Sequence, residues 1–169
     1  GFNYGKRGSG GSEKMRIGFD ARMIDHPGIG RYISNLLDAM LKPNTADKFV
    51  LYGDPNKLAA FENCQKKRYT AKIYSLNEFF SNTFRVVNLD VMHVPHFNIP
   101  FKKTKNLVIT IHDLIYISPE YAPFIKGMAV KFAISNAVKK ANLIIAVSEN
   151  TKKDIIKNFP NAEKKIKVI

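Results

Sequence analysis

The stretch MRIGFDARMIDHPGIGRYISNLLDAML, residues 15–41, contains one complete unit of strand, loop and helix. Residues 15–19 are a short apolar run, and the turn at residues 26–30 contains one proline and two glycines. Apolar residues then recur at the spacing of one helix face, and Pro43 closes the segment. The stretch therefore predicts a strand that passes through a glycine loop into a helix.

The same alternation continues to the end of the chain. Short apolar or β-branched runs predict further strands at residues 49–52, 71–74, 90–94, 106–111, 143–147 and 166–169. Helices are predicted at residues 76–87, at 124–141 and, capped by Ser148, at 149–158. The strands are too uniformly apolar to have one face in water, which is typical of a parallel sheet covered on both sides. The expected fold class is α/β, with a doubly wound, mainly parallel, Rossmann-like sheet.

The composition narrows the class of protein. A chain of 169 residues that is 45% hydrophobic can bury one core, so we expect one domain, residues 15–169. Residues 1–14, GFNYGKRGSGGSEK, predict a flexible connector, a tag or a fusion remnant. A single cysteine, Cys64, requires no oxidising compartment, so the cytoplasm is expected. The apolar runs are far shorter than the roughly 20 residues of a spanning helix, and no secretory leader is recognised.

The net charge of +13 favours anionic partners. Lysines spread over the predicted helices of the last third supply much of it, and solubility is the simplest interpretation. A nucleic-acid binder would more often combine arginine with aromatic residues on one surface. We therefore expect no nucleic-acid partner and rank an anionic membrane surface above it.

The glycine loop is the first candidate binding site. Gly28, Ile29, Gly30 and Arg31 directly precede a predicted helix, where glycines allow close approach of a ligand and exposed amides favour an anion. A tight turn without a ligand is the equally weighted alternative. A dinucleotide fingerprint would require a third glycine at Ile33, so an oxidoreductase domain is disfavoured.

Polar residues at the ends of later strands are the other candidates. His112 and Asp113 follow the strand predicted at residues 106–111, where a histidine can donate to a sugar hydroxyl or phosphate and a carboxylate can orient an acceptor. A loop pair that caps the next turn is the alternative. His93 and His96 lack a third ligand at matching spacing, so no metal site is predicted. A satisfied histidine at the strand end and a histidine that lines the binding pocket are expected instead, and His96 is the candidate for donor or acceptor binding. Ser148 is most simply a helix cap, with a role at the cleft as the second interpretation.

Other catalytic motifs are missing from the sequence. It contains no Gly-x-Ser-x-Gly elbow and no Walker loop, and Cys64 has no neighbouring base. Hydrolase-type nucleophilic catalysis therefore has little support.

Five segments together resemble glycosyltransferase family 4. They are MRIGFDAR (15–22), GIGRY (28–32), DVMHVPH (90–96), TIHDL (110–114) and ANLIIAVSENTK (141–152). Their order and approximate spacing are similar to the N-terminal half of the family, and the resemblance runs from Met15 to Ile169. It implies the GT-B architecture, in which two Rossmann-like domains face each other across a cleft. It also implies transfer of a sugar from a sugar nucleotide, with retention and without a bound metal or cofactor.

The resemblance also implies roles for individual residues. Gly28 and Gly30 would lie near the donor diphosphate and the acceptor, His112 would contact the transferred sugar, and Asp113 would line the same cleft. Family members continue beyond the equivalent of residues 167–169 into a C-terminal domain that holds most of the donor. We therefore expect an N-terminal, acceptor-side domain that is inactive or very slow alone.

The expected function is transfer of a hexose to a glycan or lipid-linked acceptor in bacterial surface polysaccharide synthesis. The expected partners are the sugar-nucleotide donor, this acceptor, the missing C-terminal domain and an anionic membrane, with the chain cytoplasmic or peripheral at the inner face of that membrane. The alternative is a non-catalytic α/β module that binds a phosphorylated ligand or a partner domain.

Overall fold

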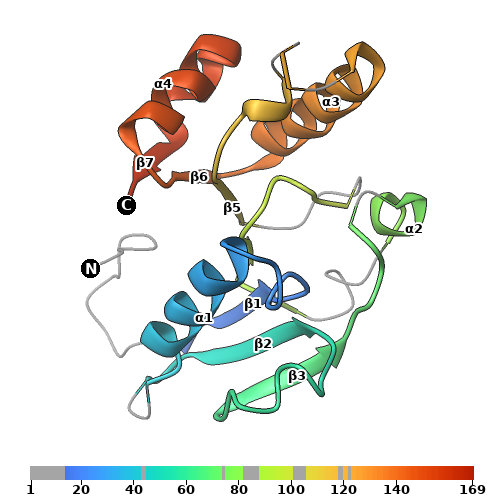
Figure 1. Ribbon diagram of the computed structural model, residues 1–169. Helices are drawn as coiled ribbons and strands as arrows, with labels where there is room; N and C mark the ends of the chain where they lie inside the picture. Colours follow the sequence, from blue (N-terminus) through green and yellow to red (C-terminus); the bar gives the residue numbers. More distant parts are fainter. Residues whose placement is uncertain are drawn as a thin grey trace.

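The computed structural model describes residues 14–42, 45–73, 75–81, 88–100, 106–117, 120–121 and 123–169. Within these residues, seven strands form one sheet in the order β3-β2-β1-β4-β5-β6-β7, and every neighbouring pair is parallel (Figure 1). The strands are β1 (Arg16–Asp20), β2 (Lys48–Gly53), β3 (Cys64–Arg68), β4 (Val91–Val94), β5 (Leu107–Ile111), β6 (Leu143–Ala146) and β7 (Ile166–Val168).

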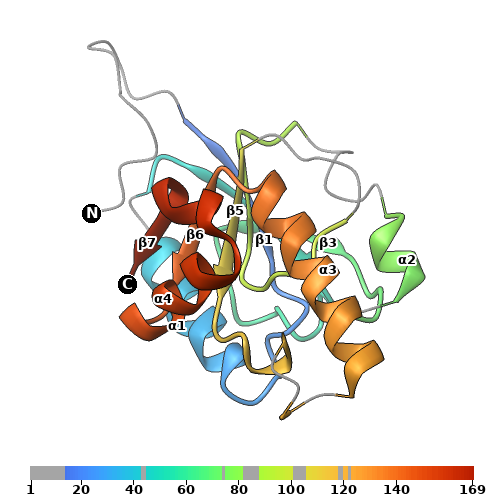
Figure 2. The ribbon, with the colours of Figure 1, turned by 90° about the horizontal axis from the view of Figure 1, so that it is seen from above.

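Helices cover both faces of the sheet. They are α1 (Ile29–Met40), α2 (Leu76–Phe79), α3 (Phe124–Lys140) and α4 (Glu149–Asn158), with 3-10 turns η2 (Ile115–Ile117) and η3 (Pro160–Lys165). Ile33 of α1 packs in one core cluster with Leu51, whereas Ile134 of α3 and Ile155 of α4 share another with Val50. Because adjacent residues of a strand point to opposite faces, α1 lies on one face, and α3 and α4 lie on the other (Figure 2). The predicted doubly wound α/β fold is therefore confirmed.

The strand order reverses at β1. β1 pairs with β2 on one side and with β4 on the other, and the chain moves outward in both directions from this pair. In open parallel sheets, ligands bind at such a switch point, beyond the carboxyl ends of the strands. The loops that follow β1, β4 and β5 meet there.

One predicted strand is wrong. Residues 71–73 are not in a strand, Tyr74 lies outside the described residues, and the third strand is β3, seven residues earlier at Cys64. β3 pairs only with β2, so it is an edge strand, and its sequence CQKKR is polar and only partly buried. Lysines on an edge strand discourage pairing with another chain, and they also remove the apolar pattern by which strands are recognised.

The other predicted elements correspond closely to those observed. Ser148 caps α4 by accepting a hydrogen bond from the backbone N–H of Thr151, and α4 ends at Asn158, both as predicted. Of the helix predicted at 76–87, only Leu76–Phe79 is helical, as α2; residues 80 and 81 are not helical, and residues 82–87 lie outside the described part. The same holds for residues 101–105, between β4 and β5, and for residues 1–13 of the predicted connector. In the described part of the chain, no helix is both long and apolar enough to cross a bilayer.

Candidate functional site

A cavity of about 850 Å³ lies at the switch point of the sheet. It is formed by the loop between β1 and α1, the loop after β4, the segment after β5, and the first turns of α3. Its described lining residues are Met23, His26, Pro27, Gly28, Ile29, His96, Phe97, His112, Asp113, Tyr116, Tyr121, Pro123, Ala129 and Val130. A mostly apolar wall with a few converging polar groups is typical of a small-molecule site.

Glycine is required at positions 28 and 30 of the β1–α1 loop for two different structural reasons. Gly28 is the N-cap of α1 with a φ of 81°, a conformation that favours glycine, and a Cβ there would meet open space. Gly30 is buried, and a Cβ on it would lie 2.1 Å from the carbonyl oxygen of Ile24. The N–H groups of Ile29 and Gly30 donate to the carbonyls of Pro27 and His26 at 3.1 and 2.7 Å. These two amides therefore serve the turn itself rather than an anion.

His112 is held in one protonation form by its surroundings. Its Nε2 lies 3.0 Å from the carbonyl oxygen of Pro95, and because a carbonyl can only accept, Nε2 carries the proton. Burial lowers the pKa of His112, although the Pro95 contact and Asp113 act in the opposite direction. The ring of Tyr32 packs edge-on against the imidazole with centroids 5.0 Å apart. His112 is therefore neutral at pH 7, and its Nδ1 is a hydrogen-bond acceptor.

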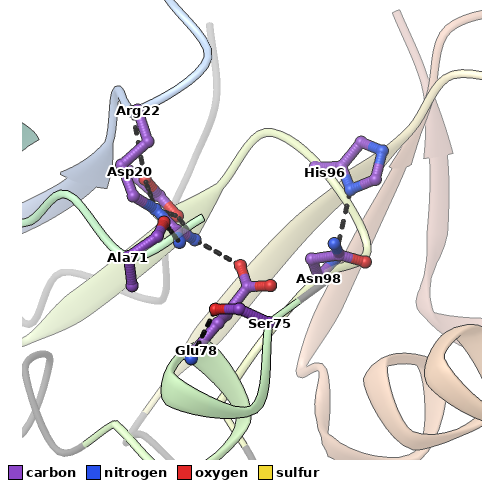
Figure 3. A network of polar contacts seen from close by, with 7 residues as sticks. All are labelled: Asp20, Arg22, Ala71, Ser75, Glu78, His96 and Asn98. Atoms are coloured by element: carbon purple, nitrogen blue, oxygen red, sulfur yellow. Dashed lines mark hydrogen bonds and ion pairs between the residues drawn. The ribbon is translucent and has the colours of Figure 1, made fainter. Parts of the chain in front are cut away.

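His96 has the same tautomer as His112 but bonds the backbone through its other nitrogen. The backbone N–H of Asn98 donates to Nδ1 of His96 at 3.3 Å, so the proton of the neutral ring is on Nε2 (Figure 3). Burial, and then the charges of His112, His26 and Arg22, lower the pKa of His96 to about 3. The cavity is thus lined by two neutral imidazoles that both carry the proton on Nε2, and the backbone contact engages Nε2 of His112 but Nδ1 of His96.

His93 lies behind the cavity rather than in its wall. It is buried, its Nε2 lies 2.9 Å from the hydroxyl of Thr110, and its ring packs edge-on against Phe19. The same Thr110 hydroxyl lies 3.1 Å from the hydroxyl of Tyr32. His93 therefore supports, through Thr110, the tyrosine that packs on His112. No group of three or more His, Cys, Asp or Glu residues suited to a metal occurs in the part of the chain that the structure describes.

The remaining predicted site residues are divided between the cavity and its supports. Asp113 lines the cavity, is exposed, and accepts a hydrogen bond from the N–H of Ile115 at 3.2 Å. Gly30, Arg31 and Ser148 do not line it: Gly30 is packed inside the turn, and Arg31 is exposed beside it. Ser148 caps α4. The structure therefore brings together Gly28, Ile29, His96, His112 and Asp113.

Several lining residues were not predicted. His26 lies in the β1–α1 loop, and the exposed Tyr116 and Tyr121 lie after His112. The signal for His26 was its position beside the Pro-Gly turn. The signal for the tyrosines was two aromatic residues shortly after a candidate catalytic pair.

A second cavity, of about 670 Å³, lies at the opposite end of the strands, near the amino ends of β1, β2 and β3. Its wall includes the cationic residues Lys14, Arg16 and Lys48. Because parallel sheets bind ligands at the carboxyl ends of their strands, the cavity with the histidines is the candidate site.

A doubly wound sheet with a ligand-sized cavity at its switch point defines a Rossmann-like binding domain. The sequence model of Glycosyltransferase Family 4 matches residues 28–169, and the chain belongs to that family. A comparison with curated proteins found no match. Family membership supports a glycosyltransferase-type function for the chain.

Proposed function

We propose that this chain is the acceptor-side domain of a retaining glycosyltransferase that transfers a hexose from a sugar nucleotide to a glycan or lipid-linked acceptor. The reaction would belong to surface polysaccharide synthesis. The observation that carries the proposal is the pair of neutral imidazoles on the cavity wall, His96 and His112, which both carry the proton on Nε2 but bond the backbone through different nitrogens.

This arrangement suits sugar hydroxyls. A hydroxyl can both donate and accept a hydrogen bond, whereas a phosphate diester offers only acceptors. Nδ1 of His112 can accept from a hydroxyl but has no proton to give to a phosphate. In this proposal His112 therefore binds the transferred sugar rather than the diphosphate.

The charge of the donor needs a partner elsewhere. Among the described residues that line the cavity, none is lysine or arginine. A diphosphate would have to be neutralised by basic residues outside this wall, which agrees with a GT-B arrangement in which a second domain closes over the donor. Transfer would then depend on fixed dipoles around the developing oxocarbenium charge, with Asp113 orienting the acceptor hydroxyl.

The experiment is to measure sugar-nucleotide hydrolysis and transfer with this chain and with a longer protein that continues beyond Ile169. We expect transfer by the longer protein and little or none by the chain alone. If no common donor supports transfer by the longer protein while phosphorylated ligands still bind, a non-catalytic binding module replaces the proposal.

A membrane surface is the proposed location of the acceptor. Met128 and Phe132 lie one helical turn apart on α3, and 59% and 60% of their surfaces are exposed. Lys131 is exposed between them in the sequence, and the exposed Tyr116 and Tyr121 line the cavity. Apolar and cationic side chains on one surface suit the interface of an anionic bilayer at the inner face of the membrane. Flotation with liposomes of anionic lipid at low salt should capture the chain, and Met128→Ser with Phe132→Ser should release it.

A further inference from the structure

A buried ion network lies next to the cavity, at the carboxyl end of β1. Arg22 donates from Nε and Nη2 to the carboxylate of Asp20 at 2.9 and 2.6 Å, and from Nη2 to Glu78 at 2.6 Å. Its Nη1 donates to the carbonyl of Ala71 at 2.9 Å, and its guanidinium lies 4.2 Å from the ring centroid of Tyr69. Figure 3 shows Arg22 between Asp20, Ala71 and Glu78. Arg22 therefore ties the end of β1 to the segment after β3 and to α2.

The three charged side chains of this network are almost completely buried. Burial alone would lower the pKa of Arg22, but Asp20 and Glu78 outweigh it and raise that pKa above its ordinary value. A charged group in this setting is stable only while its partners stay in place. The network is thus a buried, fixed contact behind the cavity wall rather than a surface contact.

Helix α2 is oriented by this network. Glu78 is completely buried, whereas Leu76 and Phe80 on either side of it expose 75% and 72% of their surfaces. An amphipathic helix normally buries its apolar residues and exposes its charges. Here the ion pair with Arg22, and the cap formed by Ser75 on the N–H of Glu78, fix the segment instead.

Arg22 also belongs to the loop that forms one wall of the cavity. Met23 and His26, which follow it, line the cavity. Ile24 between them lies against Gly30, where a Cβ would come within 2.1 Å of the Ile24 carbonyl, so the loop and the start of α1 cannot move independently. The positive charge of Arg22 also acts on His96 across the wall.

We propose that Arg22 is a positioning residue for the candidate site, and that Glu78 of α2 holds it in place so that the β1–α1 loop keeps its ligand-binding geometry. The effect of Arg22 and Glu78 on catalysis rests on the proposed transferase function. Their effect on the geometry of the β1–α1 loop is independent of that function.

The test compares two ion pairs that reach the same loop. Glu78→Gln removes the buried charge, whereas Lys57→Gln removes the partner of Asp25 in a pair that is 2.6 Å long but 52% and 61% exposed. Small displacements of site groups reduce rates strongly, so Glu78→Gln should lower kcat/KM of the full-length transferase about tenfold or more. Lys57→Gln should leave it unchanged. A purely structural role would lower the amount of folded enzyme but leave KM and the activity per folded molecule as they were.

A second readout does not require turnover. NMR signals of the His26 and His96 rings in this chain should shift in Glu78→Gln and stay in place in Lys57→Gln. If both readouts match the wild type in folded Glu78→Gln protein, the positioning role is overturned. If the rings shift but no donor supports transfer even in the wild type, the positioning role stands and the transferase proposal fails.

Glu78→Gln could also fail to fold. In that case Arg22→Lys replaces Glu78→Gln as the test variant, because lysine keeps the charge but cannot reproduce the forked contacts to two carboxylates. The same two readouts decide: shifted ring signals with lowered kcat/KM support the proposal, and wild-type values for both overturn it.

Discussion

His112 shows how one backbone carbonyl decides the chemistry of a site residue. The sequence places a histidine at the end of β5, where it could act as a donor or as an acceptor. The carbonyl of Pro95 accepts a hydrogen bond from the Nε2–H of His112, and the ring of Tyr32 blocks rotation of the imidazole from one side. Thr151 donates to the carbonyl oxygen of His112 at 3.0 Å, which fixes the backbone as well. The ring is therefore set to accept at Nδ1, the reverse of the donor role expected from sequence.

This assignment predicts different effects for two amide substitutions. The side-chain oxygen of asparagine can replace Nδ1, whereas glutamine reaches the place of Nε2. We expect His112→Asn to keep more activity than His112→Gln in the full-length transferase. The loss of one hydrogen bond of about 1 kcal/mol corresponds to roughly a fivefold difference in kcat/KM. Equal loss in both variants, at equal thermal stability, would argue against the acceptor role.

Among the strands and helices, the more completely an element is buried, the more easily its sequence reveals it. β5 and β6 were recognisable because nearly all their residues are buried, which gives continuous apolar runs. β3 was not, because its partly exposed edge position tolerates Gln, Lys and Arg. The position of α2 depends on Glu78 meeting Arg22, 56 residues earlier in the chain, and no local pattern encodes that contact. The same limit applies to His26, whose role in the wall arises only when the loops after β1, β4 and β5 meet.

Ser148 illustrates a residue that affects the site through an element. Its hydroxyl caps α4 by accepting from the N–H of Thr151, and the side chain of Thr151 then holds the carbonyl of His112. Ser148→Ala should lower the free energy of unfolding by about 1 kcal/mol, the usual cost of a lost cap. Ser148→Asp, which restores a capping oxygen, should recover most of this loss. Urea unfolding at pH 7 measures both, and a Ser148→Ala variant as stable as the wild type would contradict the cap.

The whole molecule concentrates its histidines around the switch point. His93, His96 and His112 come from β4, the loop after it and the segment after β5, and burial lowers the pKa of all three. The Rossmann-like order could be predicted because each unit repeats a strand and a crossover. The convergence of these rings could not, because it depends on β1, β4 and β5 lying side by side in the sheet.

This concentration predicts a specific loss of stability in acid. The pKa of His93 and that of His96 are each lowered to about 3, from an ordinary value near 6.5 in the unfolded chain. Below pH 6.5 the unfolded state therefore binds more protons than the folded state, so stability falls as the pH falls toward 3 and is insensitive to these groups above about 7.

Between pH 7 and pH 5 each buried histidine should lower the free energy of unfolding by about 2 kcal/mol. Urea unfolding of this chain at the two pH values measures the sum. His93→Gln should remove about 2 kcal/mol of the pH-dependent loss. A loss that is the same in the wild type and in His93→Gln would mean that carboxylates, not the histidines of the switch point, control acid unfolding.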